Sequence, residues 1–277
     1  MARRWRCGDV TFTLDRTLVM GILNVTPDSF SDGGLYENPL DAVTRGRQMV
    51  TQGADIVDVG GESTRPGAEE VAVAAELARV RPVVGGLARD LGVPVSIDTR
   101  HAEVAEGCLT VGARIINDVS GFRDPAMIEA AAASDAGVVV MHMLGEPRTM
   151  QAEPRYDDVV AEVKEYLAGQ AAVLERAGVA AERIAIDPGI GFGKTVEHNL
   201  ELLRRLPEFA ELGYAVLVGA SRKSFIGALL HEPDPMRRVQ GSIAAAAWCA
   251  MHGADIVRVH DVRDTVSALT VLRAIEG

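Results

Sequence analysis

The stretch IAIDPGIGFGK, residues 184–194, decides how the rest of the chain is interpreted. Its three apolar residues, Ile184–Ile186, suit a strand that is buried on both faces, where no alternation of polar and apolar residues is expected. Pro188 and Gly189 end this strand. An aspartate at the end of a buried strand is costly unless polar groups meet it, so Asp187 is either held by structural hydrogen bonds or directed at a ligand.

Similar apolar runs recur along the chain and alternate with helical stretches. The runs are Leu18–Leu23, Ile56–Val59, Val95–Ile97, Arg114–Ile116, Val138–Met141, Ile184–Ile186, Val216–Val218 and Ile256–Val259. The helical stretches are Leu40–Gln52, Glu69–Asp90, Ala102–Leu109, Pro125–Ser134, Asp157–Ala177, Glu197–Leu212, Arg237–His252 and Val262–Ile275. This alternation indicates an α/β fold with a parallel sheet. Eight strand–helix units predict a TIM (β/α)8 barrel, because an open doubly wound sheet has fewer strands and a phosphate-binding fingerprint after the first one.

The residues before the first apolar run predict a separate small element. Residues 5–18 have the pattern of a short β-hairpin that turns at Gly8-Asp9, ahead of the barrel as a plug or lid. Neither an interdomain linker nor a low-complexity segment interrupts the pattern. Residues 1–277 are therefore expected to form a single domain.

Composition limits the classes of function. With 277 residues and 48% hydrophobic residues, the chain can bury a sizeable core, and its apolar runs are too short to span a membrane. Three widely spaced cysteines without a CxxC pair argue against a disulfide framework or structural zinc and favour a cytoplasmic protein. A net charge of -11 disfavours nucleic-acid binding, so an anionic ligand must meet a local cluster of cations.

The residues that close the strands are the candidates for an active site, because the carboxyl ends of TIM-barrel strands build it. They are Asn24, the segment 60–65, Asp98, Asn117 with Asp118, His142, Asp187, the segment 221–223, and Arg258 with His260 and Asp261. For any single one, helix capping or backbone bonding is as good an interpretation as a functional role. A polar residue after every strand favours a site.

Two kinds of chemistry are present among these residues. Asp98, Asn117 and Asp187 offer hydrogen-bond acceptors and an amide to a planar heterocycle that is rich in donors. The side chains that offer positive charge to a phosphate or diphosphate are Lys223, Arg258, His260 and Arg65. The sequence therefore predicts a ligand that combines a heterocycle with an anion.

Neighbouring positions refine the anion site. Arg258 and His260 are two residues apart in a strand and point to the same side. Asn24 is neutral and suits a magnesium ion shared with diphosphate oxygens, since magnesium takes few protein ligands. Asp261 is expected to cap the following helix, and Ser224 opens the helix after the seventh strand, where its N–H suits a carboxylate.

Two other signals carry less weight. The residues before Lys194 resemble the end of a phosphate-binding P-loop, but the position of its first glycine is Pro188, which lacks the N–H that the phosphate needs. We therefore expect Lys194 to lie outside the phosphate chemistry. His142 is more simply a hydrogen-bonded core residue than a catalytic base.

Several ordered sequence blocks lie between Gly21 and Val262: GILNVTPDSFSDGG, DVGGESTRPGA, SIDT, INDVSG, IDPGIGFGK, GASRKSFIG and RVHDV. These blocks resemble those of the dihydropteroate synthases, a family of pterin-binding TIM barrels. The resemblance implies a transferase of folate biosynthesis that joins 6-hydroxymethyl-7,8-dihydropterin diphosphate to 4-aminobenzoate and releases diphosphate. It also implies a magnesium cofactor, a homodimer formed through barrel helices, and a sulfonamide target.

The resemblance assigns roles to individual residues. It implies that the pterin is bound by Asp98, Asn117, Met141, Asp187, Gly219 and Lys223. It implies that diphosphate is bound by Asn24, Arg258 and His260, with Asn24 also the magnesium ligand. It implies that 4-aminobenzoate is bound by Phe30, Thr64, Arg65, Pro66, Phe192, Lys223 and Ser224. The residues expected to take part in catalysis are Asp98, Asp187, Lys223 and Arg65.

Charge suggests how such a reaction proceeds. An arylamine is a weak nucleophile, so the reaction is eased if diphosphate leaves first and the aspartates stabilise a pterin-methyl cation. Two alternatives remain open: a pterin-binding methyltransferase barrel that serves a corrinoid protein, and a non-catalytic pterin-binding paralogue. The methyltransferase has no use for the SRKSF, RVHDV and GESTRPGA blocks as tools for diphosphate and aminobenzoate, and the intact loops argue against the non-catalytic paralogue.

Overall fold

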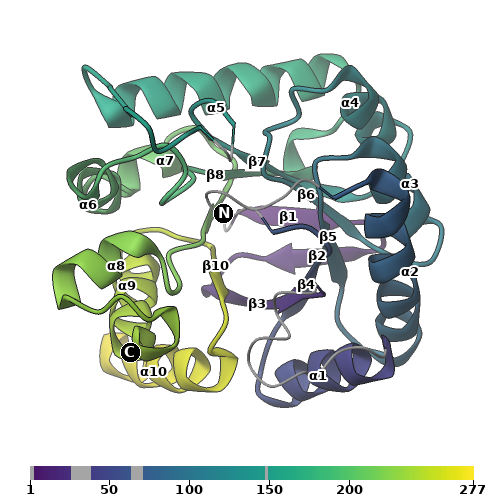
Figure 1. Cartoon of the computed structure of the whole chain (residues 1–277), viewed down its shortest axis with the longest axis horizontal. Helices are drawn as coiled ribbons and strands as arrows, with labels where there is room; N and C mark the ends of the chain where they lie inside the picture. Colours follow the sequence, from purple (N-terminus) through teal and green to yellow (C-terminus); the bar gives the residue numbers. More distant parts are fainter. Residues whose placement is uncertain (1–2, 26–38, 64–70, 147–148) are drawn as a thin grey trace.

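Eight parallel strands close into a barrel in the order β10-β3-β4-β5-β6-β7-β8-β9, as the sequence predicted. This computed structural model describes residues 3–25, 39–63, 71–146 and 149–277. The strands are β3 (Leu18–Asn24), β4 (Ile56–Gly60), β5 (Val95–Asp98), β6 (Ile115–Asp118), β7 (Gly137–Met141), β8 (Ile184–Asp187), β9 (Ala215–Val218) and β10 (Ile256–Val259). Helices follow the strands and surround the barrel, so the fold is a TIM barrel (Figure 1).

The described helices largely match the predicted stretches. They are α1 (Pro39–Thr51), α2 (Val73–Asp90), α3 (Ala102–Leu109), α4 (Pro125–Ala132), α5 (Val159–Arg176), α6 (Val196–Arg204), α7 (Pro207–Ala210), α8 (Ser224–Leu230), α9 (Val239–Met251) and α10 (Val262–Glu276), with short 3-10 turns at η2 (Ala181–Arg183) and η3 (Pro235–Arg237). One predicted helix, Glu197–Leu212, is divided into α6 and α7. Pro207 causes the break, because proline cannot continue a helix interior but suits a first position.

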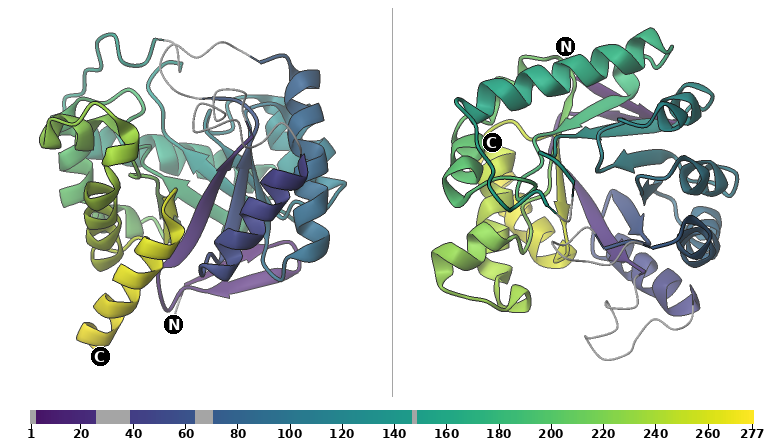
Figure 2. Two further views of the ribbon diagram at one scale, coloured as in Figure 1. Left: turned by 60° about the horizontal axis from the view of Figure 1, so that its bottom comes forward. Right: turned by 45° about the horizontal axis from the view of Figure 1, so that its top comes forward.

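An N-terminal hairpin closes one end of the barrel. Strand β1 (Arg4–Cys7) pairs antiparallel with β2 (Val10–Thr13) around the turn at Gly8-Asp9, which confirms the predicted hairpin. The left view of Figure 2 shows it in purple across the lower end of the barrel. Trp5 is fully buried and donates from Nε1 to the carbonyl oxygen of Arg183 at 3.0 Å. The hairpin is therefore a plug at the amino-terminal ends of the strands.

The barrel interior at this end is apolar. Trp5 and Cys7 pack in one buried cluster with inward-facing strand residues, which are Leu18, Met20, Ile56, Ile115, Val139, Ala185, Ala215, Leu217 and Ile256. A second, larger cluster lies between the strands and the surrounding helices. Strands buried on both faces explain why the sequence shows continuous apolar runs instead of alternation.

Several strands extend beyond the apolar runs. Asp98, Asn117, Asp118 and Asp187 belong to β5, β6 and β8, where parallel pairing continues to the first polar residue. Backbone pairing thus holds these side chains in fixed positions. None of the helices in the described part of the chain combines the length and apolarity that a membrane crossing requires.

Candidate active site at the carboxyl ends of the strands

Most of the polar residues predicted from the strand ends lie in one layer inside the barrel. Side chains on a strand return to the same face every second residue. Residues two positions beyond the apolar inner cluster therefore also face inward: Asp58, Asn117, Met141, Asp187, Gly219 and Arg258. Asp98 joins them, because it pairs in register with Asn117. We refer to these seven residues as the inner layer.

Arg258 is held between two carboxylates of this layer. Its Nε donates to Oδ2 of Asp58 at 2.6 Å, and its Nη2 donates to Oδ2 of Asp98 at 2.5 Å. The same oxygen of Asp58 accepts from Nδ2 of Asn117 at 3.1 Å. These bonds connect strands β4, β5, β6 and β10 and fix the guanidinium on one side of the interior.

The strand-end prediction missed Asp58. This residue is fully buried in the middle of β4, and its Oδ2 serves two residues that were predicted, Arg258 and Asn117. The signal in the sequence was the carboxylate between Val57 and Val59, since a charge inside an apolar strand needs partners. Asp58 therefore fixes the orientation of Arg258 and Asn117 within the inner layer.

Protonation in this layer changes near neutral pH. Burial raises the pKa of Asp98 to about 7, against the opposing effect of Arg258, and raises the pKa of Asp187 to about 6. Burial also lowers the pKa of Lys223 to about 8. Burial disfavours the charge of Arg258 as well, but Asp58 and Asp98 outweigh it and raise its pKa. Perturbed groups gathered at one barrel end indicate a functional site.

Glycines keep space around Asp187. Its Oδ1 accepts from the N–H of Gly189 at 2.7 Å. A Cβ at Gly219 would lie 4.0 Å from Oδ2 of Asp187 and 3.8 Å from Cβ of Arg258, so a larger side chain there would fill the space between them. Gly189 has φ +67°, and a Cβ on it would meet the carbonyl oxygen of His142 at 1.9 Å, so only glycine fits this turn.

Lys223 and Phe192 form another side of the site. Nζ of Lys223 lies 3.8 Å from the centroid of the Phe192 ring, a cation–π contact. Gly191 has φ +82°, and a Cβ on it would lie only 3.0 Å from Cδ of Lys223, so the glycine lets the lysine chain pass. Phe192 packs in an apolar cluster with Met141. The arrangement offers a ring face and a cation beside the inner layer.

A gap lined by oxygen atoms lies where three strands end. Asn24, Gly60 and Asp98 are neighbours in register on β3, β4 and β5. A Cβ at Gly60 would lie 3.5 Å from Oδ2 of Asp98 and 3.6 Å from Oδ1 of Asn24. Amide and carboxylate oxygens on either side of such a space suit a hard cation such as Mg²⁺. The donor set therefore fits magnesium.

Comparisons with known proteins identify the family. The model of the pterin binding enzymes matches residues 20–260. The chain is 53% identical to the dihydropteroate synthase of Escherichia coli strain K12 over 256 residues, 92% of this chain and 90% of that protein. The chain belongs to the dihydropteroate synthase family. The resemblance seen in the sequence blocks is thereby confirmed.

Solved dihydropteroate synthases share the architecture. The Xanthomonas albilineans enzyme with 4-aminobenzoic acid has a TM-score of 0.94 and 46% identity, covering 100% of this chain and 99% of that one. The Burkholderia cenocepacia enzyme complexed with 7,8-dihydropteroate has a TM-score of 0.91 and 48% identity, covering 99% and 97%. The alignment spans essentially the whole chain in both cases.

His260, which the likeness to dihydropteroate synthases assigns to diphosphate, lies next to Ser221. Its Nδ1 lies 3.0 Å from Oγ of Ser221, which also accepts from the backbone N–H of His260 at 3.3 Å. Asp261 makes no side-chain cap on α10, so that expectation was wrong. It accepts instead from Nε and Nη2 of Arg222 at 3.1 and 2.7 Å, and such a two-point charged pair is stronger than a single capping bond.

Lys194 and His142 form a buried pair behind the turn of the IDPGIGFGK block, one of the blocks shared with dihydropteroate synthases. Nζ of Lys194 lies 2.9 Å from Nδ1 of His142 and donates to the carbonyl oxygen of Phe192 at 3.0 Å. Burial lowers the pKa of Lys194 to about 7 and that of His142 to about 3. A neutral, hydrogen-bonded His142 confirms its interpretation as a core residue.

Part of the 4-aminobenzoate set expected in a dihydropteroate synthase lies outside the described residues. These positions are Phe30, Thr64, Arg65 and Pro66. Of the other three, Phe192 and Lys223 contact each other, and Ser224 is the exposed first residue of α8. The described part thus brings together a ring, a cation and a helix start.

Proposed function

We propose that this chain condenses 6-hydroxymethyl-7,8-dihydropterin diphosphate with 4-aminobenzoate, giving 7,8-dihydropteroate and diphosphate. The observation that carries the proposal is the inner layer. In it, Asp98, Asn117 and Asp187 lie at the carboxyl ends of β5, β6 and β8, close to Lys223. The identity of 53% to a dihydropteroate synthase disfavours the corrinoid methyltransferase and the non-catalytic paralogue.

The inner layer provides acceptors for the donor-rich edge of a pterin. Asn117 uses its Nδ2 on Asp58, which leaves its carbonyl oxygen to accept from a ligand. Asp187 uses Oδ1 on Gly189, which leaves Oδ2 toward the space beside Gly219. Met141 and Gly219 belong to the same layer as these acceptors. We propose that the pterin ring lies there, with Lys223 at its edge.

The cation sites account for the diphosphate. We propose that Asn24 holds Mg²⁺ at the oxygen-lined gap beside Gly60, where the ion would neutralise charge on the diphosphate. Arg258 has N–H groups beyond the two that bind Asp58 and Asp98. His260 lies two residues farther along and offers its imidazole toward the rim.

The reaction is a substitution at the pterin methylene carbon. Its C–O bond breaks, and the electron pair leaves with diphosphate. The amine nitrogen of 4-aminobenzoate then forms the C–N bond and loses a proton. Asp58, Asp98 and Arg258 together carry a formal charge of about -1 when ionised, and Asp187 adds another. This fixed negative potential stabilises the positive charge that develops on the pterin-methyl group.

Phe192, Lys223 and Ser224 are our described candidates for 4-aminobenzoate. The ring of Phe192 offers a stacking face to an arene. The start of α8 at Ser224 and the charge of Lys223 suit a carboxylate. Arg65, Thr64, Pro66 and Phe30 complete the proposed set.

We also propose a homodimer formed through α6, α8 and α9. Leu229, Leu230 and Trp248 expose 53%, 51% and 43% of their surface and border one apolar groove between these helices. Such a patch marks an interaction site. Light scattering should give twice the chain mass for the wild type, and Leu229→Glu should give the monomer. A wild-type monomer at micromolar concentration would refute this part.

A cytoplasmic location fits the cysteines. Cys7, Cys108 and Cys249 are all buried free thiols, the state that a reducing compartment maintains. We propose that the reaction takes place there.

The deciding experiment supplies both substrates. The purified chain is incubated with 4-aminobenzoate, the pterin diphosphate and Mg²⁺, and dihydropteroate and diphosphate are measured. We expect the two products in equal amounts, and none when 4-aminobenzoate is omitted. Asp98→Asn, which we expect to slow product formation, serves as the site control. Release of diphosphate without dihydropteroate, or no reaction at all, would overturn the proposal.

A further inference from the structure

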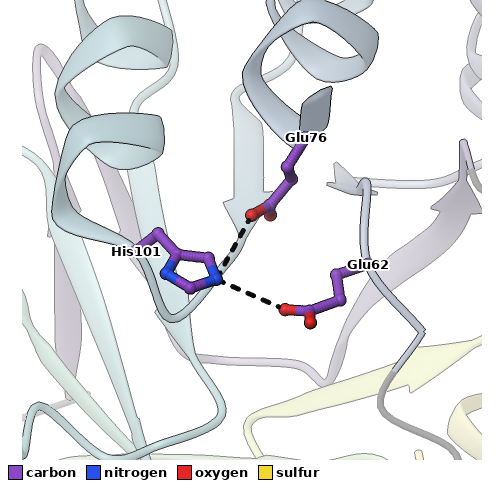
Figure 3. A group of neighbouring side chains, drawn as sticks. All are labelled: Glu62, Glu76 and His101. Carbon is purple, nitrogen blue, oxygen red and sulfur yellow. Dashed lines mark ion pairs between the residues drawn. The ribbon is translucent and has the colours of Figure 1, made fainter. Parts of the chain in front are cut away.

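Glu62, Glu76 and His101 form a compact cluster outside the inner layer (Figure 3). Glu62 follows β4, Glu76 lies in the first turn of α2, and His101 directly precedes α3. Nε2 of His101 lies 3.6 Å from Oε2 of Glu62 and 3.8 Å from Oε2 of Glu76. One potential ligand atom of each residue lies within 4.8 Å of the other two.

Glu76 is the unusual member of the cluster. Its exposure is 0%, and neither of its carboxylate oxygens has a hydrogen-bond partner. Nε2 of His101 has none either. Figure 3 shows the Glu76 carboxylate directed at His101. A buried carboxylate normally has donors around it, so this one calls for a positive group that the protein chain does not place at bonding distance.

The spacing matches the ligands of one cation better than a hydrogen bond. The gaps of 3.6 and 3.8 Å exceed the length of a hydrogen bond. With metal–ligand bonds of about 2.0–2.2 Å, the ligand atoms of a tetrahedral site lie roughly 3.3–3.6 Å apart. A small inward movement of the side chains would therefore complete the coordination, and His101 is partly exposed, which leaves a path from solvent.

The charges favour a dication. Arg100 donates to both oxygens of Glu62, each at 3.1 Å, and fixes the orientation of that carboxylate. With neutral His101, the group of Glu62, Glu76 and Arg100 keeps one uncompensated negative charge. Burial raises the pKa of Glu76, even though the Thr99 hydroxyl, His101 and Arg100 act in the opposite direction.

We propose that Glu62, Glu76 and His101 bind a divalent transition-metal ion such as Zn²⁺ or Co²⁺. Two carboxylates with one imidazole suit this class, whereas Mg²⁺ takes oxygen ligands. The site is separate from the magnesium expected at Asn24. A bound ion ties the end of β4 to α2 and to the start of α3, and thus joins the two chain segments that flank residues 64–70.

Binding to the proposed site can be tested with Co²⁺ as the only added metal ion. The full chain is stripped with a chelator, exchanged into buffer and titrated with Co²⁺, and visible absorption and metal content after gel filtration are measured. We expect one saturable equivalent per chain and a higher Tm. Zn²⁺ should displace the cobalt signal, whereas Mg²⁺ should not. No retained cobalt in the wild type would overturn the proposal.

Three variants make the assignment specific. His101→Gln should weaken Co²⁺ binding by at least about tenfold, since the loss of an outer-shell partner alone costs about 10–100-fold. Glu76→Gln should do the same, and without metal it should be at least as stable as the wild type, because it removes an uncompensated buried charge. His252→Gln, at a half-buried histidine stacked on Trp248 and outside the cluster, is the matched control and should bind normally.

Two outcomes would contradict the proposed site. Equal cobalt binding in His101→Gln and the wild type would assign the metal to another place. A stability gain on acidification that His101→Gln abolishes, without cobalt bound to the wild type, would assign the cluster to a protonated His101 between two carboxylates. Metal binding is read without an activity assay, so this test and that of the proposed reaction fail independently.

Discussion

The two ends of the barrel are built by the same strands and serve opposite purposes. On β8, Ala185 packs under the hairpin with Trp5, whereas Asp187, two residues farther on the same face, is an acid with a pKa near 6. The same step leads from Ile256 to Arg258 on β10. A distance of roughly 6.6 Å along each strand thus separates packing from chemistry.

Because packing and chemistry lie in separate layers of the same strands, we expect the stability of the fold and the activity of the site to be nearly independent. The cluster under the hairpin consists of apolar side chains, with one buried charged residue, Arg183, bonded to Trp5 through its carbonyl oxygen, whereas the inner layer has four charged side chains. Substitutions in one layer should therefore change one property and spare the other. The following predictions test that division, from the largest expected effect to the smallest.

Trp5→Ala should lower the free energy of unfolding by about 3–5 kcal/mol, the usual cost of removing a large buried aromatic side chain. It also removes the hydrogen bond to the carbonyl oxygen of Arg183. Urea denaturation measures the loss, with Trp5→Phe as the control that keeps most of the packing. The kcat of the folded variant should stay within a few-fold of the wild type. A large fall in the kcat of fully folded Trp5→Ala would contradict the separation of stability from activity.

Asp98→Asn should act in the opposite way and slow turnover by roughly 2–4 kcal/mol, as the loss of one preorganised electrostatic group does. Binding of the pterin diphosphate should change less. The unfolding free energy at pH 7 should not fall, because burial already raises the pKa of this acid to about 7. Single-turnover rates and urea denaturation are the measurements, and a defect confined to binding would contradict this role.

Asp187→Asn should weaken pterin binding by about 1–3 kcal/mol and spare the chemical step. The amide turns one acceptor into a donor that faces the donors of the ligand, and a buried mispaired group costs about this much. Interactions made equally in ground and transition states mainly set binding. Calorimetry with the pterin diphosphate tests it. If this variant mostly slows chemistry while Asp98→Asn mostly weakens binding, the two carboxylates have exchanged roles.

Acid should weaken pterin binding by about tenfold, or about 1.4 kcal/mol, for each pH unit below the pKa of Asp187. Burial raises this pKa to about 6, so below pH 6 the free protein carries a neutral acid that must lose its proton to accept from the ligand. The contribution of Asp187 to the free energy of unfolding changes with pH in the opposite direction. A raised folded pKa favours the protonated native state, so this contribution grows as pH falls from 6 toward ordinary carboxyl values. Calorimetry from pH 5 to 8 should show the slope, and Asp187→Asn should flatten it.

Lys194→Ala should have the smallest effect on activity and keep kcat/KM within a few-fold. The lysine serves His142 and the carbonyl oxygen of Phe192 behind the turn, so its loss should appear mainly in Tm. Steady-state kinetics beside Arg258→Ala is the comparison. An equal loss in the two variants would place Lys194 in the phosphate chemistry after all.

The barrel and much of the site could be predicted because both follow from local patterns. Buried parallel strands produce apolar runs, and polar residues such as Asp98 and Asp187 mark the strand ends. Asp58 was missed because it interrupts a run instead of ending one. The bonds from Arg258 to Asp58 and Asp98 join residues 200 and 160 positions apart, and such distant partners depend on barrel closure, which no local pattern records.

The Glu62, Glu76 and His101 cluster shows the same limit. Glu76 lies on an amphipathic helix where a glutamate is expected to face solvent, but packing against the end of β4 buries it completely. In the sequence, His101 is indistinguishable from any other polar residue that precedes a helix. Only the approach of α2 to α3 brings these side chains together.

Closure of the barrel between its first and last strands affects how the chain is made. Leu18 of β3 pairs with Ile256 of β10, and Trp5 bonds to Arg183, so these earlier residues find their partners only after much of the following chain has been synthesised. Until β10 leaves the ribosome, β3 and β9 each present an open edge that can pair with other chains. The two edges that β10 covers are therefore the places where an incomplete chain can associate with other chains before the barrel closes.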